Sequence, residues 1–417
     1  MATSSSDYRV AVIGAGVVGL AAACRLANAR ANVVLIDPME PGLGCSYGNA
    51  GHIATELIFP LASPATLAHA PRYLLNSDSP LSVRGGYALQ ILPWLTRFAL
   101  ASRPSAFKRG TEALAELQAG ALESLRNLLR TLGLEQQLQT RGHIVLAETR
   151  ASQAALLNEQ ESLAEYDVPT TWLSAAEVAE LAPDLTTNLQ GALHFPGSGH
   201  VLEPYQLSQG FFAAFQEAGG QYLRGGVRKI ATRSDGSFEL QVEAKPITSE
   251  KIVLAAGAWS KSLARDLGHR LPLDTERGYH LSAPGWSGSF NVPIASYERK
   301  TIMTPLSSGL RITGFVEFGG LDLPPAASRF GKLETHIRAL LPNAEFPEFK
   351  RWMGFRPSMP DHLPVIGASP KNPNAILAFG HQHLGLTLAG ITADIVECLV
   401  ANRRPPINIQ PFRCDRF

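Results

Sequence analysis

Three glycines near the N-terminus, Gly14, Gly16 and Gly19, form a G-x-G-x-x-G motif between a β-branched run and an apolar helical pattern. Asp37 closes the following strand-like run, NVVLID, 18 residues after Gly19. In such a unit the glycines allow a tight turn, close approach to a pyrophosphate and close helix packing, while the acid accepts ribose hydroxyls. The helix N-terminus adds unpaired N–H groups for the phosphates. The motif therefore predicts a bound dinucleotide, and an acid at position 37 disfavours NADP.

The segment after Asp37 bears on which dinucleotide is bound. An NAD-dependent dehydrogenase usually continues with further βα units, whereas here the chain reads PMEPGLGCSYGNAGHIATELIFP, rich in glycine and small polar residues. Such a loop offers backbone amides to a large ligand. This departs from the layout of an NAD-dependent dehydrogenase, and the choice between FAD and NAD stays open at this point.

A second glycine-rich stretch, FGHQHLGLTLAG at 379–390, carries His381 and His383 ahead of an apolar run. His-x-His can present two imidazoles to zinc, but a zinc site needs a third nearby ligand. The sequence shows no Cys, His or acidic cluster of suitable spacing. We therefore expect no metal and interpret the stretch as the mouth of a helix whose N-terminus stabilises an anion.

The composition narrows the classes of partner. The 417 residues carry 37 Lys and Arg against 36 Asp and Glu, so no basic field favours nucleic acid. Four scattered cysteines argue against a disulfide framework or zinc ribbon and suit a reducing compartment. The N-terminus lacks the basic and apolar regions of a secretory signal. These observations predict a cytoplasmic protein with a small-molecule ligand.

The apolar stretch 85–103 is about as long as a membrane span, but Pro93 and Arg97 interrupt it. Three interpretations are open. The stretch lies on the inner face of a membrane with Trp94 and Phe98 as anchors, contacts a partner subunit, or packs as a helix that covers the substrate.

The pattern of elements predicts an α/β protein. Strand, helix and strand occupy 8–37, helices are expected at 104–132 and 151–166, and a strand-rich meander runs from 225 to 257. Further strand-like stretches at 271–318 have the composition of an antiparallel sheet. We expect a Rossmann-like FAD-binding domain (1–80, 150–265 and 355–417) interleaved with an α+β substrate domain on a largely antiparallel sheet (81–149 and 266–354).

Taken together, these stretches resemble the flavin-dependent amine oxidoreductases of the D-amino acid oxidase and glycine oxidase superfamily, and most closely the D-amino acid dehydrogenases. The resemblance covers essentially the whole chain and rests on the glycine motif with Asp37, GLGCSYGNAGHI, AAGAWS, GFRPSMPDHLPVIG and the 379–390 stretch. It implies cofactor contacts by Gly14, Ala15, Gly16, Val18, Gly19, Asp37, Pro38, Gly44, Cys45, Ser46, Asn49, Ala50, Gly51, Val227, Ala256, Gly257, Gly380, His381, His383, Leu384, Gly385, Leu386 and Thr387.

The same resemblance implies three residues on the substrate side. Arg356, in GFRP, matches the arginine that binds the substrate carboxylate, and its guanidinium suits a bidentate clamp. Tyr279, in RGYHL, adds a hydroxyl to the carboxylate or covers the substrate, with plain strand packing as the alternative. His52, after GNAG, accepts a proton or binds a substrate hydroxyl, or is satisfied by the backbone.

The implied function is FAD-dependent dehydrogenation of a D-amino or cyclic imino acid, by hydride transfer from Cα to flavin N5 to give an imine. D-proline-like substrates, including cis-4-hydroxy-D-proline, are the leading candidates because GHQHLG and RGYHL look closest to the hydroxyproline-catabolic members. A quinone or carrier is favoured over O2 as acceptor. Asn49 stands where some relatives carry a tethering histidine, so FAD is expected to be non-covalent. The alternatives are a glycine/sarcosine-type oxidase using O2 and a flavoprotein electron-transfer subunit.

Overall fold

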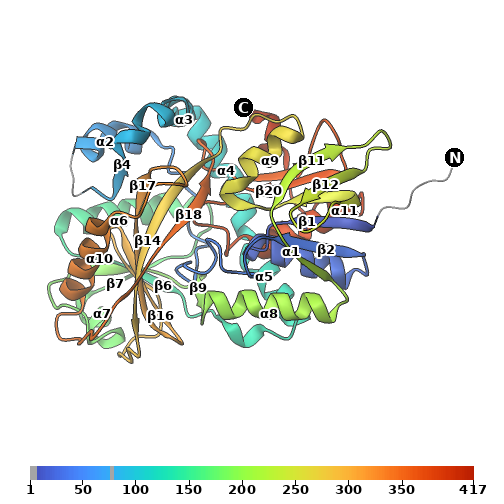
Figure 1. The fold of residues 1–417 in the computed structure, drawn as a ribbon. Helices are drawn as coiled ribbons and strands as arrows, with labels where there is room; N and C mark the ends of the chain where they lie inside the picture. The colour runs from blue at the N-terminus through green and yellow to red at the C-terminus, as the bar shows by residue number, and fades with distance from the viewer. Residues whose placement is uncertain (1–6, 76–78) are drawn as a thin grey trace.

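The computed structural model describes residues 7–75 and 79–417. Two large sheets divide the molecule into halves, seen side by side in Figure 1, and their strands interleave along the chain. A small third sheet of β3 (His52–Ile53), β9 (Gly199–Val201) and β5 (Leu138–Gln139) accompanies them. This agrees with the expected α/β class of a Rossmann-like half interleaved with a largely antiparallel half.

The first sheet contains the predicted strand–helix–strand unit, β1 (Tyr8–Ile13), α1 (Val17–Asn28) and β2 (Val33–Asp37). β1 lies in parallel between β2 and β13 (Ile247–Leu254), while β10 (Gln221–Arg224) extends the β2 side and β20 (Ala375–Phe379) pairs with the end of β13. β12 (Phe238–Val242) and β11 (Val227–Thr232) continue from β13 in antiparallel order, as the meander predicted. β19 (Val365–Ala368) pairs antiparallel with β20.

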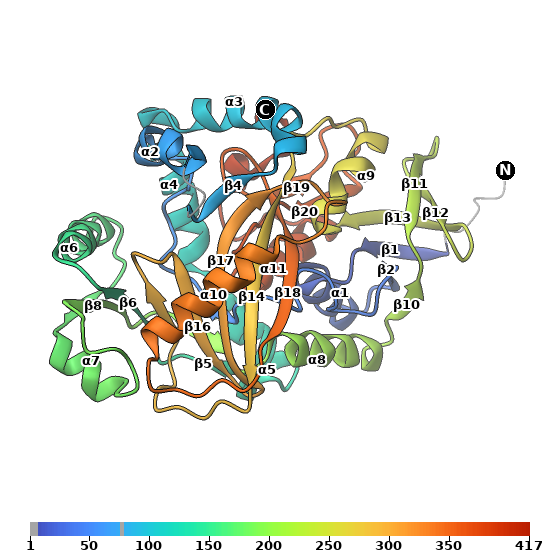
Figure 2. The same ribbon diagram turned by 60° about the vertical axis from the view of Figure 1, so that its left-hand side comes forward.

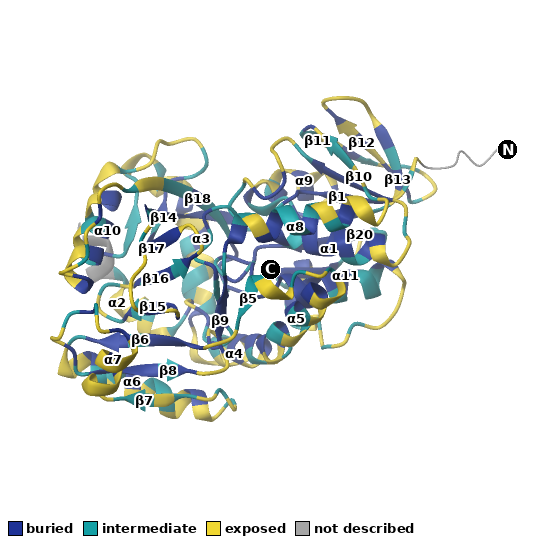
Figure 3. Cartoon of the chain, turned by 90° about the horizontal axis from the view of Figure 1, so that it is seen from below, coloured by how far each residue is buried: buried dark blue, intermediate teal, exposed yellow. Residues whose placement is uncertain are grey.

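Alternation along β1 sends side chains to two different cores. Val10 and Val12 pack with α1, α8 (Pro204–Glu217), α5 (Ala121–Thr131) and α11 (Ala389–Val400). Ala11 and Ile13 pack instead with residues of β11, β12 and α9 (Ser260–Asp266). α1 is almost wholly buried (Figure 3), because α8 and α11 pack against it as well as the sheet. The first sheet is thus covered on both faces, and these two cores hold the ends of its strands in place.

The second sheet runs in the order β18 (Lys350–Ser358), β14 (Asp274–Pro284), β17 (Gly309–Phe318), β16 (Thr301–Leu306), β15 (Ile294–Ser296), β6 (His143–Ala147), β8 (Gly191–Phe195) and β7 (Thr171–Leu173). Its pairs are antiparallel apart from β15 with β6 and β17 with the short β4 (Leu81–Val83). Helix α10 (Ala327–Leu340) lies across it in Figure 2 and contributes Phe330, Leu333 and Ile337 to its core.

The strand pairing corrects the expected domain boundaries in two places. The range 150–265 was assigned to the first half, but β7 and β8 pair within the second sheet, beside α6 (Arg150–Ala164) and α7 (Ala175–Leu181) in Figure 3. The range 81–149 was assigned to the second half, yet α5 packs in the core around α1. Gly120 separates α5 from α4 (Pro104–Ala119), where one long helix was expected.

The apolar stretch 85–103 forms a 3-10 turn, Gly85–Tyr87, followed by α3 (Ala88–Ala101); α2 (Pro64–Leu75) precedes it in the chain. Trp94 is only 4% exposed and its indole N–H donates to the Ser358 carbonyl at 3.2 Å, while Phe98 packs against His362. The two side chains proposed as membrane anchors therefore point into the protein. None of the described helices has the length and hydrophobicity needed to cross a membrane.

Candidate active site

The carboxyl ends of four parallel strands meet in one row of the first sheet. Ile13 of β1 pairs with Ile36 of β2 and with Leu254 of β13, and Leu254 pairs with Leu377 of β20. The residues just beyond this row are those that the motifs singled out: Gly14, Asp37, Ala256 with Gly257, and Gly380 with His381. Ligands of open α/β sheets bind at this edge.

Two glycines of the motif after β1, Gly14 and Gly19, have no room for a side chain. Gly14 has φ of +108°, and a Cβ there would lie 2.4 Å from the Ala255 carbonyl oxygen. A Cβ at Gly19 would lie 1.9 Å from the Gly14 carbonyl oxygen. The first and third glycines of the motif therefore let β1, α1 and β13 approach one another.

Two polar side chains fix the backbone of this turn. Asp37 accepts N–H bonds from Ala15 (2.7 Å) and Met39 (2.8 Å), and burial raises the pKa of its carboxyl group while those bonds oppose the rise. The hydroxyl of Ser46 accepts from the N–H of Val17 at 2.8 Å. The first turn of α1 and the loop after β2 are thus tied together around one space.

That space is a cavity of about 370 Å³ at the strand ends. Among the described residues, sixteen of the expected cofactor residues line it: Gly14, Ala15, Gly16, Val18, Asp37, Pro38, Gly44, Cys45, Ser46, Asn49, Val227, Ala256, Gly257, His381, Gly385 and Leu386. The glycine turn, the loop of 44–49, the start of β11 and the C-terminal turn therefore surround a single cavity.

Seven expected residues lie outside the lining as the structure describes it: Gly19, Ala50, Gly51, Gly380, His383, Leu384 and Thr387. Several have other tasks. Gly19 allows the helix to approach the strand. Gly51 and Gly380 adopt positive φ of +78° and +81°, and the hydroxyl of Thr387 accepts from the N–H of Ala54 at 2.9 Å. These residues shape the segments behind the wall.

The C-terminal turn differs from the expectation that residues 380–387 form the mouth of the helix. Helix α11 begins only at Ala389, and the stretch before it is a series of turns. Gly380 and Gln382 both adopt positive φ, +81° and +51°, which interrupts helical backbone between β20 and α11. The imidazole of His381 is held by Thr392 of α11 at 3.0 Å and lines the cavity.

The loop that carries Ser46 and Asn49 is held from the second sheet. Arg311 of β17 donates to the carbonyls of Asn49 (2.7 Å) and Tyr47 (3.2 Å), and also to Glu203 at 3.3 Å. His280 of β14 adds a contact with the Gly48 carbonyl at 3.2 Å and stacks on Trp352, with ring centroids 5.0 Å apart. The second sheet thus positions one wall of the cavity.

Arg356 lies on β18 between two residues that line the cavity, Phe355 and Pro357. Its guanidinium crosses Gly278 of β14, where a Cβ would meet Nη2 at 2.3 Å. It donates from Nη1 to the Phe315 carbonyl at 3.0 Å. Among the side chains that the structure describes, no carboxylate forms an ion pair with this partly buried cation.

The charge of Arg356 acts on His383 in the C-terminal turn. Burial, and next the positive charge of Arg356, lower the pKa of this imidazole to about 3. Burial raises the pKa of the Cys45 thiol to about 11, and the positive charge of Arg356 opposes this rise. The charge of Arg356 therefore acts on the loop after β2 and on the C-terminal turn, both of which carry lining residues.

The structure places Tyr279 in the core and corrects its expected role on the substrate side. Its side chain is 1% exposed in the core beneath α10, its hydroxyl donates to Glu317 at 2.8 Å, and it accepts from the N–H of Ala326 at 3.0 Å. Arg277, two residues earlier, pairs with the same Glu317 at 3.3 Å. Alternation along β14 sends both side chains away from Gly278 and Arg356, so strand packing is the interpretation that holds for Tyr279.

His52 is held apart from the cavity by its neighbours. Its Nε2 lies 2.9 Å from the Ser198 hydroxyl and 3.6 Å from Glu56, and its ring lies 4.3 Å from that of His143. Burial, followed by the neighbouring His200, lowers the pKa of His52 to about 3. A side-chain hydroxyl satisfies this histidine, where a backbone group or a substrate was expected.

Sequence reasoning missed several lining residues. Trp259 follows Gly257 within the AAGAWS stretch and packs edge-on against Phe355, with ring centroids 5.9 Å apart. Gln382 separates the two histidines of the C-terminal turn. Trp259 and Gln382 could have been predicted from the sequence, because they lie next to Gly257 and His381 in the chain. Phe355 comes from the other sheet, so only the tertiary fold brings it to the wall.

The fold and the cavity define a dinucleotide-binding protein with a Rossmann-like half and a second, largely antiparallel sheet. Residues 9–399 match the family DAO, FAD dependent oxidoreductase. The chain is 30% identical to a D-amino-acid oxidase of Bradyrhizobium diazoefficiens over 424 aligned positions, covering 98% of each chain. The chain belongs to this family of FAD-dependent oxidoreductases. FAD is its cofactor, and the NAD-only alternative is wrong.

Solved structures share the fold at lower identity. Glycine oxidase from Geobacillus kaustophilus superposes with a TM-score of 0.76 at 24% identity, over 99% of this chain and 100% of that one. L-proline dehydrogenase from P. horikoshii gives 0.75 at 16% identity, over 99% and 98%. At these identities the likeness bears on the fold alone.

Proposed function

We propose that the protein dehydrogenates a D-amino or cyclic imino acid at its CH–NH2 or CH–NH group, with D-proline-like substrates, including cis-4-hydroxy-D-proline, as the leading candidates. The observation that carries the proposal is Arg356, a partly buried cation without a described acid partner, beside the residues that line the cofactor cavity. A substrate carboxylate would supply the missing counter-charge.

Arg356 acts as an anchor in this proposal. Its Nη1 is held by the Phe315 carbonyl, so Nε and Nη2 are available for the two oxygens of a carboxylate. Fixing the carboxylate directs Cα toward the cofactor, and FAD when bound supplies the hydride acceptor, leaving an imine. His383 stays neutral near pH 7 because its pKa is about 3, so it does not repel a substrate amine.

The proposed cofactor contacts follow the lining of the cavity. The turn of Gly14 and Gly16 and the start of α1 at Val18 would hold the pyrophosphate, and the Asp37 carboxylate would accept ribose hydroxyls. The start of β11 at Val227 would meet the adenine. The loop 44–49 presents Asn49 and no histidine to the cavity, which supports non-covalent FAD.

The test is an anaerobic visible titration of the purified holoprotein with D-proline, cis-4-hydroxy-D-proline, other D-amino acids, glycine, sarcosine and L-proline. Bleaching of the flavin band by a D-imino acid at low concentration supports the proposal. Bleaching only by glycine or sarcosine would favour the second candidate, a glycine/sarcosine-type oxidase. Failure with every amine would leave an electron-transfer subunit.

The electron acceptor is proposed to be a quinone or carrier in preference to O2. Turnover with a dye or quinone analogue, compared with O2 alone, decides between them.

We also propose a cytoplasmic protein with α3 as a docking surface for the inner face of a membrane or a partner subunit. Support comes from its exposed leucines, Leu89 (83%), Leu92 (51%) and Leu100 (48%). Vesicle flotation with Leu89→Ser as the control variant tests the membrane case.

A further inference from the structure

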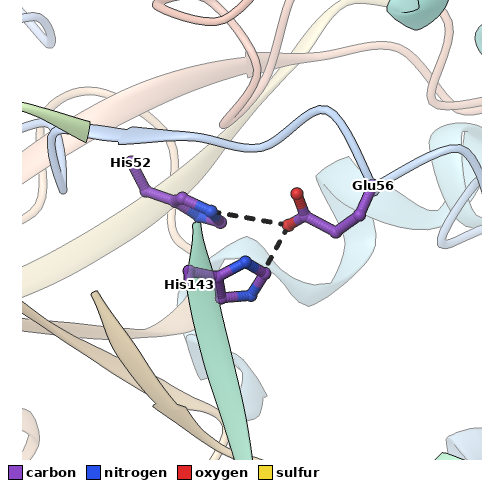
Figure 4. A group of neighbouring side chains, drawn as sticks. All are labelled: His52, Glu56 and His143. Carbon is purple, nitrogen blue, oxygen red and sulfur yellow. Dashed lines mark ion pairs between the residues drawn. The ribbon is translucent and has the colours of Figure 1, made fainter. Parts of the chain in front are cut away.

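Three titratable side chains from distant parts of the chain converge behind the loop of 44–51. His52 lies on β3, Glu56 follows in the next turn, and His143 begins β6 of the second sheet (Figure 4). The Nε2 atoms of His52 and His143 lie 3.6 Å and 3.7 Å from Glu56 Oε1. One ligand atom from each residue lies within 4.8 Å of the others.

The group is buried and incompletely satisfied. Glu56 is 6% exposed and His143 is 2% exposed. Within the described part of the chain, Glu56 Oε2 and His143 Nδ1 are buried without a hydrogen-bond partner. Buried polar atoms without partners are costly, and a buried carboxylate needs a proton or a cation. The described side chains therefore leave this buried polar group incompletely satisfied.

The types of the three side chains indicate which metal ion they could bind. Two imidazoles and one carboxylate form a ligand set that Zn²⁺ uses in proteins, with bond lengths of about 2.0–2.2 Å. Neighbouring ligands of a tetrahedral site are then about 3.4 Å apart. The separations of 3.6 Å and 3.7 Å are close to that value, so small side-chain movements would close the site.

A fourth position is also present. The hydroxyl of Ser198 lies 2.9 Å from His52 Nε2 and donates to the Ile53 carbonyl at 2.7 Å, which leaves an oxygen lone pair available beside the group.

We propose that His52, Glu56 and His143 bind one Zn²⁺ ion, with Ser198 or a water completing the coordination. The spacing of residues in the sequence predicts no metal site. His143 lies far from His52 in the chain, and only the pairing of β3 and β6 with their neighbours brings the two residues together. The ion would join the end of the cofactor loop to the second sheet, a structural role separate from the chemistry at Arg356.

The test uses full-length holoprotein without a histidine tag, produced in zinc-supplemented medium. Elemental analysis is expected to give about one zinc per chain. After a chelator removes the metal, added Zn²⁺ is expected to raise the unfolding temperature, read by flavin release, by roughly 5 °C. Zinc below about 0.1 per chain, together with an unchanged unfolding temperature on adding Zn²⁺, would overturn the proposal.

Variants separate a metal from a shared proton. Glu56→Gln keeps the shape and neutral hydrogen bonding of a protonated glutamate but is a poor zinc ligand, so it should weaken Zn²⁺ binding by at least about 100-fold. His143→Gln should do the same. His194→Gln is the matched control, because His194 lies on the neighbouring strand β8 and is outside the group. Zinc binding by Glu56→Gln as tight as that of the wild type would show that Glu56 is not a ligand and would overturn the proposal.

Discussion

Three arginines on neighbouring strands of the second sheet differ in whether an acidic side chain pairs with them. Arg277 of β14 and Arg311 of β17 are buried, and each has a glutamate, Glu317 and Glu203, at 3.3 Å. Arg356 of β18 has a backbone carbonyl but no described acid. Because an unpaired cation in a protein is costly, the difference supports the proposal that Arg356 binds a ligand, whereas Arg277 and Arg311 hold the fold.

The largest effect is expected at a paired arginine. Arg277→Ala leaves Glu317 buried without its cation and removes the bonds that Arg277 donates to the carbonyls of Gly320 and Leu323. The free energy of unfolding should fall by about 4 kcal/mol. Urea unfolding of the holoprotein measures it. A loss below about 1 kcal/mol would place Arg277 with the exposed pairs and break the comparison.

The unpaired arginine should give the opposite pattern. Arg356→Ala is expected to lower kcat/KM for an amino acid substrate by about 100- to 1000-fold, roughly 3–4 kcal/mol, with FAD content and unfolding free energy nearly unchanged. Arg356→Lys should recover only part of the loss because an ammonium lacks the bidentate fork. Equal losses of activity and stability would make Arg356 another structural arginine.

Arg311 should show an intermediate effect, because it is paired and also holds the cofactor loop. Arg311→Met is expected to weaken FAD binding by about 30-fold, or roughly 2 kcal/mol, measured by titrating apoprotein with FAD. Combining it with Glu203→Gln removes the unpaired carboxylate. If the double variant bound FAD like the wild type, the effect would belong to the ion pair alone.

The buried, neutral His381, unlike the charged arginines, should make the stability of the protein depend on pH. Burial lowers the pKa of His381 to about 3, whereas its ordinary value is 6.5. Between these values the unfolded chain binds a proton that the folded chain does not, so stability is retained above pH 6.5 and lost as the pH falls. From pH 7.5 to 5 the wild type should lose about 2 kcal/mol more than His381→Gln. Parallel unfolding curves at the two pH values would contradict this.

The smallest effect is expected at Tyr279. Tyr279→Phe removes a hydroxyl that donates to Glu317 and accepts from the Ala326 N–H, so stability should fall by about 1–2 kcal/mol. Turnover per folded molecule should stay at the wild-type level. A selective rise in KM would return Tyr279 to the substrate side.

The parts that sequence predicted are those whose geometry is local. The strand, turn, helix and strand around Gly14 and Asp37 lie within 30 residues, and the structure places these residues at one strand edge. The orientation of Tyr279 could not be read from RGYHL, since it depends on which face of β14 meets α10. The assignment of β7 and β8 to the wrong half has the same cause, because sheet pairing joins distant segments.

The grip of Arg311 on the carbonyls of Tyr47 and Asn49 crosses from one half of the molecule to the other. The loop it holds also forms a wall of the FAD cavity. Cofactor binding and the docking of the two halves are therefore linked equilibria, and each must strengthen the other by the same factor. FAD bound against this loop is then expected to stabilise the contact between the two halves as well as to accept the hydride.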